Sequence, residues 1–106
     1  MDEPSPYVTE YRVVYSEQVR NGLKDLVARA CEHGMKKMLL QAIKDLDYRL
    51  KIYPHFGEHL IDLNLKPARL LIGVVGPLVV RYVLDDEMRL VMVVSPITPM
   101  PHSGLE

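Results

Sequence analysis

Apolar residues recur every three to four positions through two stretches in the first half of the chain. Residues 16–33 carry one stripe, in which Ser16 supplies a capping oxygen and Gly34 a left-handed stop. Residues 35–53 carry a second stripe, which Pro54 ends. Because only Gly34 separates the stripes, the pattern predicts two helices that turn back on each other as a hairpin.

The other apolar positions follow the pattern of strands. A β-branched and aromatic stretch at residues 11–15 predicts a strand before the first helix. After Gly57 the chain predicts an edge strand and three longer strands, at residues 59–65, 69–75, 78–84 and 88–94. Short turns at residues 76–77 and 85–87 connect the last strands, so we expect these strands to be antiparallel neighbours.

The order β-α-α-β-β-β, with one more strand at the edge, predicts an α+β fold in which the helix hairpin packs on a twisted antiparallel sheet. A length of 106 residues allows one domain, which we place at residues 10–95. A loose arm at residues 1–9 precedes this domain. A proline-rich tail at residues 96–106 follows it, and no regular element is expected at residues 95–104. Residues 105–106 resemble the remnant of a cloning tag and are not expected to contribute to a site.

The composition narrows the class of protein further. A single cysteine, Cys31, excludes an internal disulfide and fits a reducing cytoplasm. The acidic first residues do not resemble a signal peptide, and no apolar run reaches the ~18 residues that span a bilayer, so we predict a cytoplasmic protein without membrane contact. The net charge of -1 means that nucleic-acid binding would need a local basic patch. No motif implies a cofactor.

Four segments, taken in order, resemble a known family. They are the strand at residues 11–16 that opens into a helix, the Pro/Gly-marked helix exit at 53–60, the strand at 69–73 with an arginine before a glycine, and the hairpin at 80–87 in which a tyrosine strand ends in an acidic turn. Together they resemble the RelE/ParE superfamily of toxin–antitoxin systems. The resemblance covers residues 11–94 and implies a RelE/ParE-like fold and an antitoxin-like protein partner.

The chain departs from the pattern of the RNA-cutting members of that family. Leu71 and Val79 stand where those members have arginines, and residues 95–99 lack the usual basic charge. RNA cleavage by the 2′-hydroxyl needs a base, an acid and cations that hold the phosphate, and arginine suits the phosphate because its planar fork bonds two oxygens. The resemblance therefore implies a toxin-like protein that lacks most of the usual cleavage residues.

Two arginines are candidate catalytic residues. Arg81 shares a strand face with Val79 and Val83, so it would reach a phosphate in the family's cleft or form a salt bridge with a nearby acid. Arg69 matches the first arginine of the family's strand, where it would bind phosphate or begin the strand in solvent. Tyr82 points to the face opposite Arg81 and is assigned to packing.

Two histidines are candidate acid–base residues, because histidine titrates near neutrality. His55 and His59 lie on either side of Gly57, which breaks any helix between them, so their rings need not share a face. Exposed loop histidines are the alternative. His102 would be a third member, and no spacing among the three defines a metal site.

Two further features support partner contact or packing. The second predicted helix has a basic face, which consists of Lys36, Lys37, Lys44, Arg49 and Lys51. This face would contact RNA, an acidic partner or only solvent. Met92 is assigned to the core.

The sequence leads us to rank a partner-binding module with toxin ancestry first. The alternatives are a ribosome-dependent mRNA endonuclease that uses Arg81, Arg69 and a histidine, a gyrase-directed toxin of the ParE kind, and a homodimeric structural domain. In the homodimer, the apolar strands at residues 70–75 and 78–84 would be buried on both faces.

Overall fold

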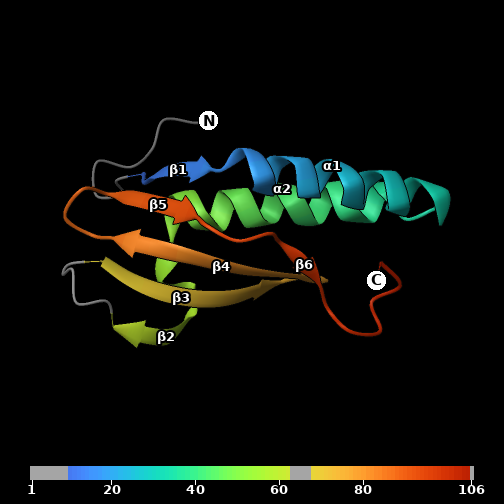
Figure 1. Cartoon of the computed structure of the whole chain (residues 1–106). Helices are drawn as coiled ribbons and strands as arrows, with labels where there is room; N and C mark the ends of the chain where they lie inside the picture. The colour runs from blue at the N-terminus through green and yellow to red at the C-terminus, as the bar shows by residue number, and fades with distance from the viewer. Residues whose placement is uncertain (1–9, 63–67, 106) are drawn as a thin grey trace.

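The computed structural model describes residues 10–62 and 68–105, which form two helices against one mixed sheet (Figure 1). The elements are β1 (Arg12–Tyr15), α1 (Glu17–Glu32), α2 (Lys36–Ile52), the 3-10 turn η1 (Pro54–Phe56), β2 (Glu58–Asp62), β3 (Ala68–Val75), β4 (Leu78–Asp85), β5 (Leu90–Val93) and β6 (Thr98–Pro99). The α+β class predicted from the sequence is confirmed. The predicted arm at 1–9, the end of the edge strand at 63–65 and Glu106 lie outside the described residues.

The helix hairpin forms as its apolar stripes predict. The Ser16 hydroxyl accepts a hydrogen bond from the Val19 N–H at 3.1 Å and caps α1, and Gly34 adopts a φ of 71° between the helices. Both stripes are buried against the sheet; the residues are Val19, Leu26, Ala30, Leu39, Ala42, Leu46 and Leu50.

The sheet is mixed, which corrects the prediction of a wholly antiparallel sheet. The strand order is β1-β5-β4-β3-β2, and β1 pairs with β5 in parallel, with Arg12 opposite Leu90. The strands from β2 to β5 alternate in direction, because each pairs with the next as an antiparallel neighbour. Three successive reversals leave β5 antiparallel to β2, and β1 runs in the same direction as β5 beside it.

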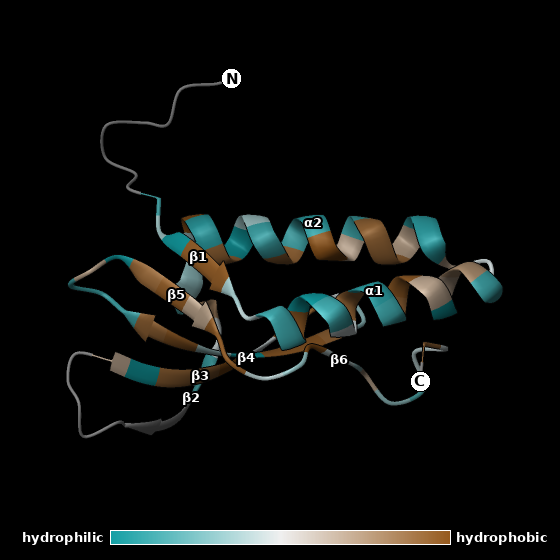
Figure 2. Cartoon of the chain, turned by 45° about the horizontal axis from the view of Figure 1, so that its top comes forward, coloured by the Kyte–Doolittle hydropathy of each residue, from teal (hydrophilic) through white to brown (hydrophobic). Residues whose placement is uncertain are grey.

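Side chains of the three central strands alternate between the helix hairpin and the opposite face. The inward set forms the core with the helix stripes; it is Leu71, Val75, Leu78, Val80, Tyr82, Leu84, Val91 and Val93. Figure 2 shows the hydrophobic character of the central strands that face the two helices. The assignment of Tyr82 to packing is confirmed, since its side chain is fully buried. Met92 does not belong to the buried core. Its neighbours Val91 and Val93 point inward, and Met92 is half-buried on the other face.

Tyr82 also fixes the segment that follows α2. Its hydroxyl donates a hydrogen bond to the Pro54 carbonyl and accepts one from the Gly57 N–H at 3.1 Å. A Cβ at Gly57 would lie 2.4 Å from that oxygen, so glycine is required for this close approach. Burial raises the pKa of Tyr82 to about 12, against the opposing effect of the Gly57 N–H.

The prediction that residues 95–104 lack a regular element is wrong at one point. Thr98 and Pro99 form β6, which pairs with Val79 and Leu78 of β4. The prolines around this strand conceal it in the sequence, and proline is tolerated because β6 is short and lies off the main run of the sheet. Leu105, assigned to a tag remnant, is only 2% exposed and packs in the core.

No helix in the two described ranges is both long and apolar enough to cross a membrane.

Candidate functional site

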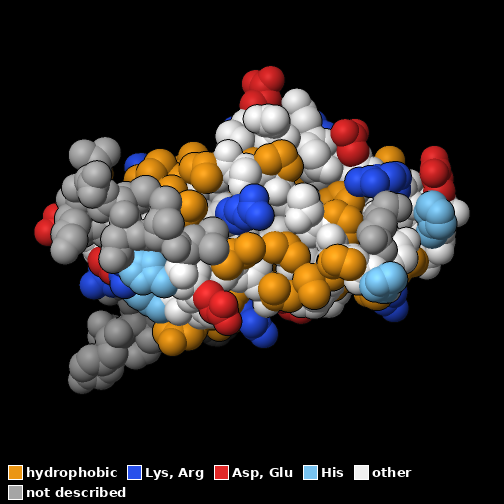
Figure 3. Space-filling view, turned by 60° about the horizontal axis from the view of Figure 1, so that its bottom comes forward, with side chains coloured by type: hydrophobic (Ala, Val, Ile, Leu, Met, Phe, Trp, Pro, Cys, Tyr) orange, Lys and Arg blue, Asp and Glu red, His pale blue; other side chains and the backbone are white. Residues whose placement is uncertain are grey.

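The sheet face turned away from the helices exposes apolar side chains from several strands. We call it the open face and define it by Val14, Leu70, Ile72, Val74, Val79, Arg81, Val83, Leu90 and Met92. Most of these side chains are half-buried by their neighbours, but Val14 is 44% and Val74 49% exposed. Hydrophobic side chains gather across the surface seen in Figure 3, with a cationic side chain among them. A contiguous apolar surface of this kind is typical of an interaction site.

Arg81 is the cation among the apolar side chains of the open face. The strand register places Arg12 and Asp85, both opposite Leu90, and Glu58, opposite Ile72, on the same side of the sheet. Arg81 lies on β4 opposite Ile72, exposed between the half-buried Val79 and Val83, as strand alternation predicts. Within the described residues it makes no ion pair, so the predicted salt bridge to a nearby acid does not form there. Beside it lies a hollow of about 190 Å³, lined by Val79, Arg81, Ser95, Pro96 and Thr98. The guanidinium is therefore available to an acidic group that enters this hollow.

A second group of polar residues lies at the end of the sheet where β3 begins and β4 ends. We call it the Asp86 cluster: Tyr11, His55, Arg69, Asp86 and Arg89. One oxygen of Asp86 accepts hydrogen bonds from the Tyr11 hydroxyl and from Nε2 of His55, each at 2.7 Å. The other oxygen forms an ion pair with Arg69. The carboxylate thus joins the start of β1, the turn η1, the start of β3 and the β4–β5 turn.

Ring contacts complete the Asp86 cluster. The His55 ring meets Tyr11 edge-on, with centroids 5.8 Å apart and planes at 78°, and its other neighbour is Tyr53 at 5.9 Å. Arg89 has a positive φ of 51° and places its guanidinium 5.5 Å from the centroid of the Tyr11 ring. His55 is therefore held on two sides by aromatic rings and on a third by a carboxylate.

The electrostatics favour an ionised Asp86. Desolvation by burial raises the pKa of this carboxyl, but the hydrogen bonds from Tyr11 and His55 and the charge of Arg69 outweigh it, and the net effect lowers the pKa. The pKa of Tyr11 is raised, first by desolvation and then by the hydrogen bond to Asp86, against the charges of Arg89 and Arg69, which lower it. A histidine oriented by a carboxylate is an arrangement found in general bases. Arg69 is already paired with Asp86, which leaves Arg89, stacked on the Tyr11 ring, as the cation of the cluster without an ion pair among the described residues.

The structure brings two of the four predicted catalytic residues together and separates the other two. His55 and Arg69 meet through Asp86. Arg69 pairs with Leu84 and points to the helix side, whereas Arg81 points to the open face, so the two arginines lie on opposite sides of the sheet. His59 lies on β2, opposite Leu71, and is not part of the Asp86 cluster.

The remaining predicted groups lie outside the Asp86 cluster, and only Arg49 among them lines a hollow with residues of the open face, Ile72 and Val74. The basic residues of α2 are exposed, and Lys51 is paired with Asp47 at 2.9 Å. His102 lies in the C-terminal tail with a positive φ of 64°. Among the described residues, no group of three or more His, Cys, Asp or Glu is placed to hold a metal ion.

Sequence reasoning missed Tyr11, Asp86 and Arg89 as members of a cluster. Asp86 was assigned to an ordinary polar turn, which starts at this residue in the structure. One signal was present in the sequence: Tyr82, Leu84 and Asp86 alternate along one line, so an acid at that position follows two buried residues onto the helix side. Comparison of the chain with family models, with curated proteins and with solved structures gave no match.

Proposed function

We propose that this chain is a partner-binding module with a RelE/ParE-like fold, a toxin-like protein that holds an antitoxin-like protein on its open face. The observation that carries the proposal is the exposed, unpaired Arg81 within an apolar sheet surface. The topology supports the family assignment, because the first strand lies parallel to the last long strand and a helix hairpin covers the opposite face. The family and the toxin ancestry rest on the sequence resemblance.

The chemistry of the open face defines the partner. Apolar side chains of β3, β4 and β5 surround Arg81, so the complementary segment would be amphipathic, with an apolar stripe and one carboxylate. The carboxylate would enter the hollow beside Arg81 and form a bidentate pair with the guanidinium. Burial of the apolar residues would supply most of the affinity, and the ion pair would fix the register.

The test is direct binding to the product of the adjacent gene, measured by isothermal titration calorimetry. We expect a stable complex that Arg81→Glu weakens by about tenfold or more, because the substitution sets two negative charges against each other. Arg29→Glu makes the same charge change on an exposed position of α1 and should leave the affinity unchanged. A monomeric protein with no measurable affinity for that product contradicts the proposal.

Growth after induced expression separates this reading from the alternatives. An endonuclease that uses Arg81 would stop growth, and Arg81→Ala would relieve the arrest. A gyrase-directed toxin would stop growth both as the wild type and as the Arg81→Ala variant, and it would induce a DNA-damage response. Normal growth during expression of the wild type and of the Arg81→Ala variant supports partner binding without toxicity. The homodimer reading draws on the same open face, and sedimentation of the isolated chain tests it.

A further inference from the structure

The strand β1 forms one edge of the sheet, and half of its backbone groups point outward. The Arg12 N–H donates to the Arg89 carbonyl at 2.9 Å, toward β5, whereas the Tyr11 N–H donates to the Lys51 carbonyl at 2.8 Å, away from β5. Backbone groups alternate along a strand, so the N–H groups of Val13 and Tyr15 also face away from β5. In the described residues no further strand pairs with this edge.

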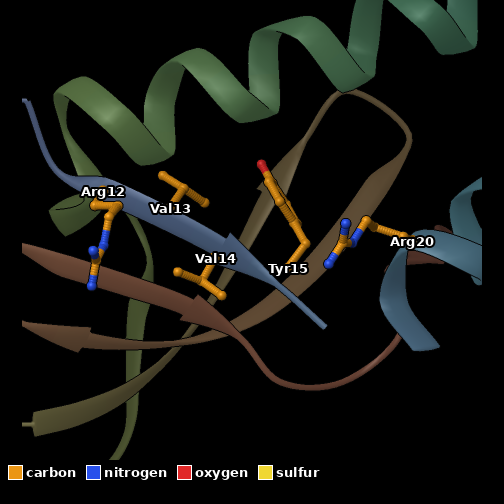
Figure 4. Close-up of a pocket in the computed structure, with 5 residues that line it drawn as sticks. All are labelled: Arg12, Val13, Val14, Tyr15 and Arg20. Atoms are coloured by element: carbon orange, nitrogen blue, oxygen red, sulfur yellow. The ribbon is translucent and has the colours of Figure 1, made fainter. Parts of the chain in front are cut away.

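A hollow of about 360 Å³ follows the same edge and carries positive charge. It is lined by the whole of β1 together with one residue of α1: Arg12, Val13, Val14, Tyr15 and Arg20. Arg20 reaches from the start of α1 back toward the end of β1, while Arg12 stands at the beginning of the strand (Figure 4). Both arginines are exposed, and neither makes an ion pair with any described residue.

The opposite edge of the sheet differs from β1 in two ways. The pairing of β2 with β3 shifts register between His59 and Ile61, and such a bulge twists an edge away from further pairing. That strand also begins with an exposed acid, Glu58. The edge at β1 has neither a bulge nor a proline, although the strand is short, carries Arg12 and has the Tyr11 N–H bonded to the Lys51 carbonyl of α2. The outward groups of Val13 and Tyr15 are therefore the part of this edge with which an added strand would pair.

We propose that the edge of β1 accepts an extended acidic segment of a partner protein as an added strand. The segment would pair its backbone with the outward groups of Val13 and Tyr15 and place a carboxylate beside each of Arg12 and Arg20. Charge favours this occupant over a second copy of the chain, since two copies of β1 side by side would bring together four uncompensated guanidinium groups. The edge adjoins the open face, because Val14 belongs to both, but the hollow along β1 shares no lining residue with the hollow beside Arg81. The inference is therefore tested through Arg12 and Arg20 and not through Arg81.

The test uses a fluorescein-labelled, end-blocked peptide, Glu-Val-Thr-Val-Thr-Glu, and the full chain, with binding followed by fluorescence anisotropy. We expect saturable binding, much weaker binding of the same peptide with lysine at both ends, and no binding when alternate amides are N-methylated. Arg12→Glu and Arg20→Glu should each lower the affinity for the glutamate peptide by about fivefold or more. Arg29→Glu is the matched control and should not change the affinity.

Amide hydrogen exchange provides a second readout that does not depend on the arginines. In the free protein the Arg12 and Val14 amides should be protected by β5, and those of Val13 and Tyr15 should exchange faster. Peptide binding should slow exchange at Val13 and Tyr15. Val13→Pro removes one outward donor without touching the bonds to β5, so it should reduce peptide binding while circular dichroism stays unchanged.

Several results would overturn the proposal. They are the absence of binding up to about 1 mM peptide, binding that leaves Val13 and Tyr15 unprotected, and equal weakening by Arg29→Glu. Binding that appears only after removal of residues 1–9 would also overturn it, because the edge would then be covered by the chain's own arm.

Discussion

His55 and Asp86 stand 31 positions apart in the chain and meet through a hydrogen bond of 2.7 Å between Nε2 and a carboxylate oxygen. The same oxygen accepts the Tyr11 hydroxyl, and the second oxygen pairs with Arg69. One turn residue therefore holds three other segments of the fold in place, and its removal should affect all of them.

Asp86→Asn should lower the free energy of unfolding by about 1 kcal/mol, measured by urea denaturation at neutral pH. The amide keeps the shape of the side chain but loses the negative charge that faces Arg69 and His55. The value is modest because the side chain of Asp86 is 38% exposed and water screens its ion pairs. Glu87→Gln removes an exposed charge at the next position and should have no effect.

The Asp86 cluster should also make stability depend on pH in the acid range. The folded-state pKa of Asp86 lies below its ordinary value of 3.8, so the folded protein binds a proton there less readily than the unfolded chain. The stabilisation is complete above that ordinary value and is lost as the pH falls through the folded-state pKa. Urea midpoints measured from pH 6 down to about pH 2.5 should fall more steeply for the wild type than for Asp86→Asn; parallel curves would refute this.

The two candidate arginines should differ in their effect on stability. Arg69→Ala removes the partner of Asp86 and should cost about 0.5 to 1 kcal/mol, because the pair is partly exposed. Arg81→Ala removes no ion pair among the described residues and should change stability by less than about 0.5 kcal/mol. Thermal denaturation of both variants beside the wild type tests the contrast, and a large loss for Arg81→Ala would show that this residue has a structural role.

Tyr82→Phe should destabilise the fold by about 1 to 3 kcal/mol. The substitution leaves the Pro54 carbonyl and the Gly57 N–H without their partner while the ring stays in place. Tyr48→Phe removes the hydroxyl of a side chain that is 65% exposed and should be neutral. Equal urea midpoints for the two variants would mean that water replaces the lost hydroxyl.

Leu105→Ala should lower the free energy of unfolding by about 1 to 3 kcal/mol, because this side chain is buried in the core. A remnant of a cloning tag is not expected to pack in the core. An unchanged melting temperature of Leu105→Ala would therefore support the assignment of Leu105 to such a remnant. Pro101→Ala alters an exposed position of the same tail and is the control.

Periodicity predicts the secondary structure of this chain well, because each element buries one face and each begins or ends at a recognisable residue. Ser16 and Gly34 delimit α1, and the alternation around Arg81 and Tyr82 places their side chains on opposite faces. Met92 was misassigned because an apolar residue in a strand fits either face, and only the positions of its neighbours decide between them.

Long-range pairing could not be predicted in the same way. Nothing near Arg12 in the sequence indicates that its strand will lie parallel to the strand of Leu90. The Asp86 cluster likewise depends on contacts between distant segments. In the sequence alone, Asp86 therefore looks like an ordinary residue of a polar turn. The arginine Arg69 was identified from the family resemblance, but its partner was not.

The parallel pairing of β1 with β5 has a consequence for synthesis of the chain. The first strand emerges from the ribosome early, yet its partner in the sheet begins only at Leu90. Until then β1 has no neighbour, and the apolar stripes of the helix hairpin have no complete sheet to cover. Closure of the fold is therefore a late event with a large loop to close, which favours slow folding and a nascent chain exposed to chaperones.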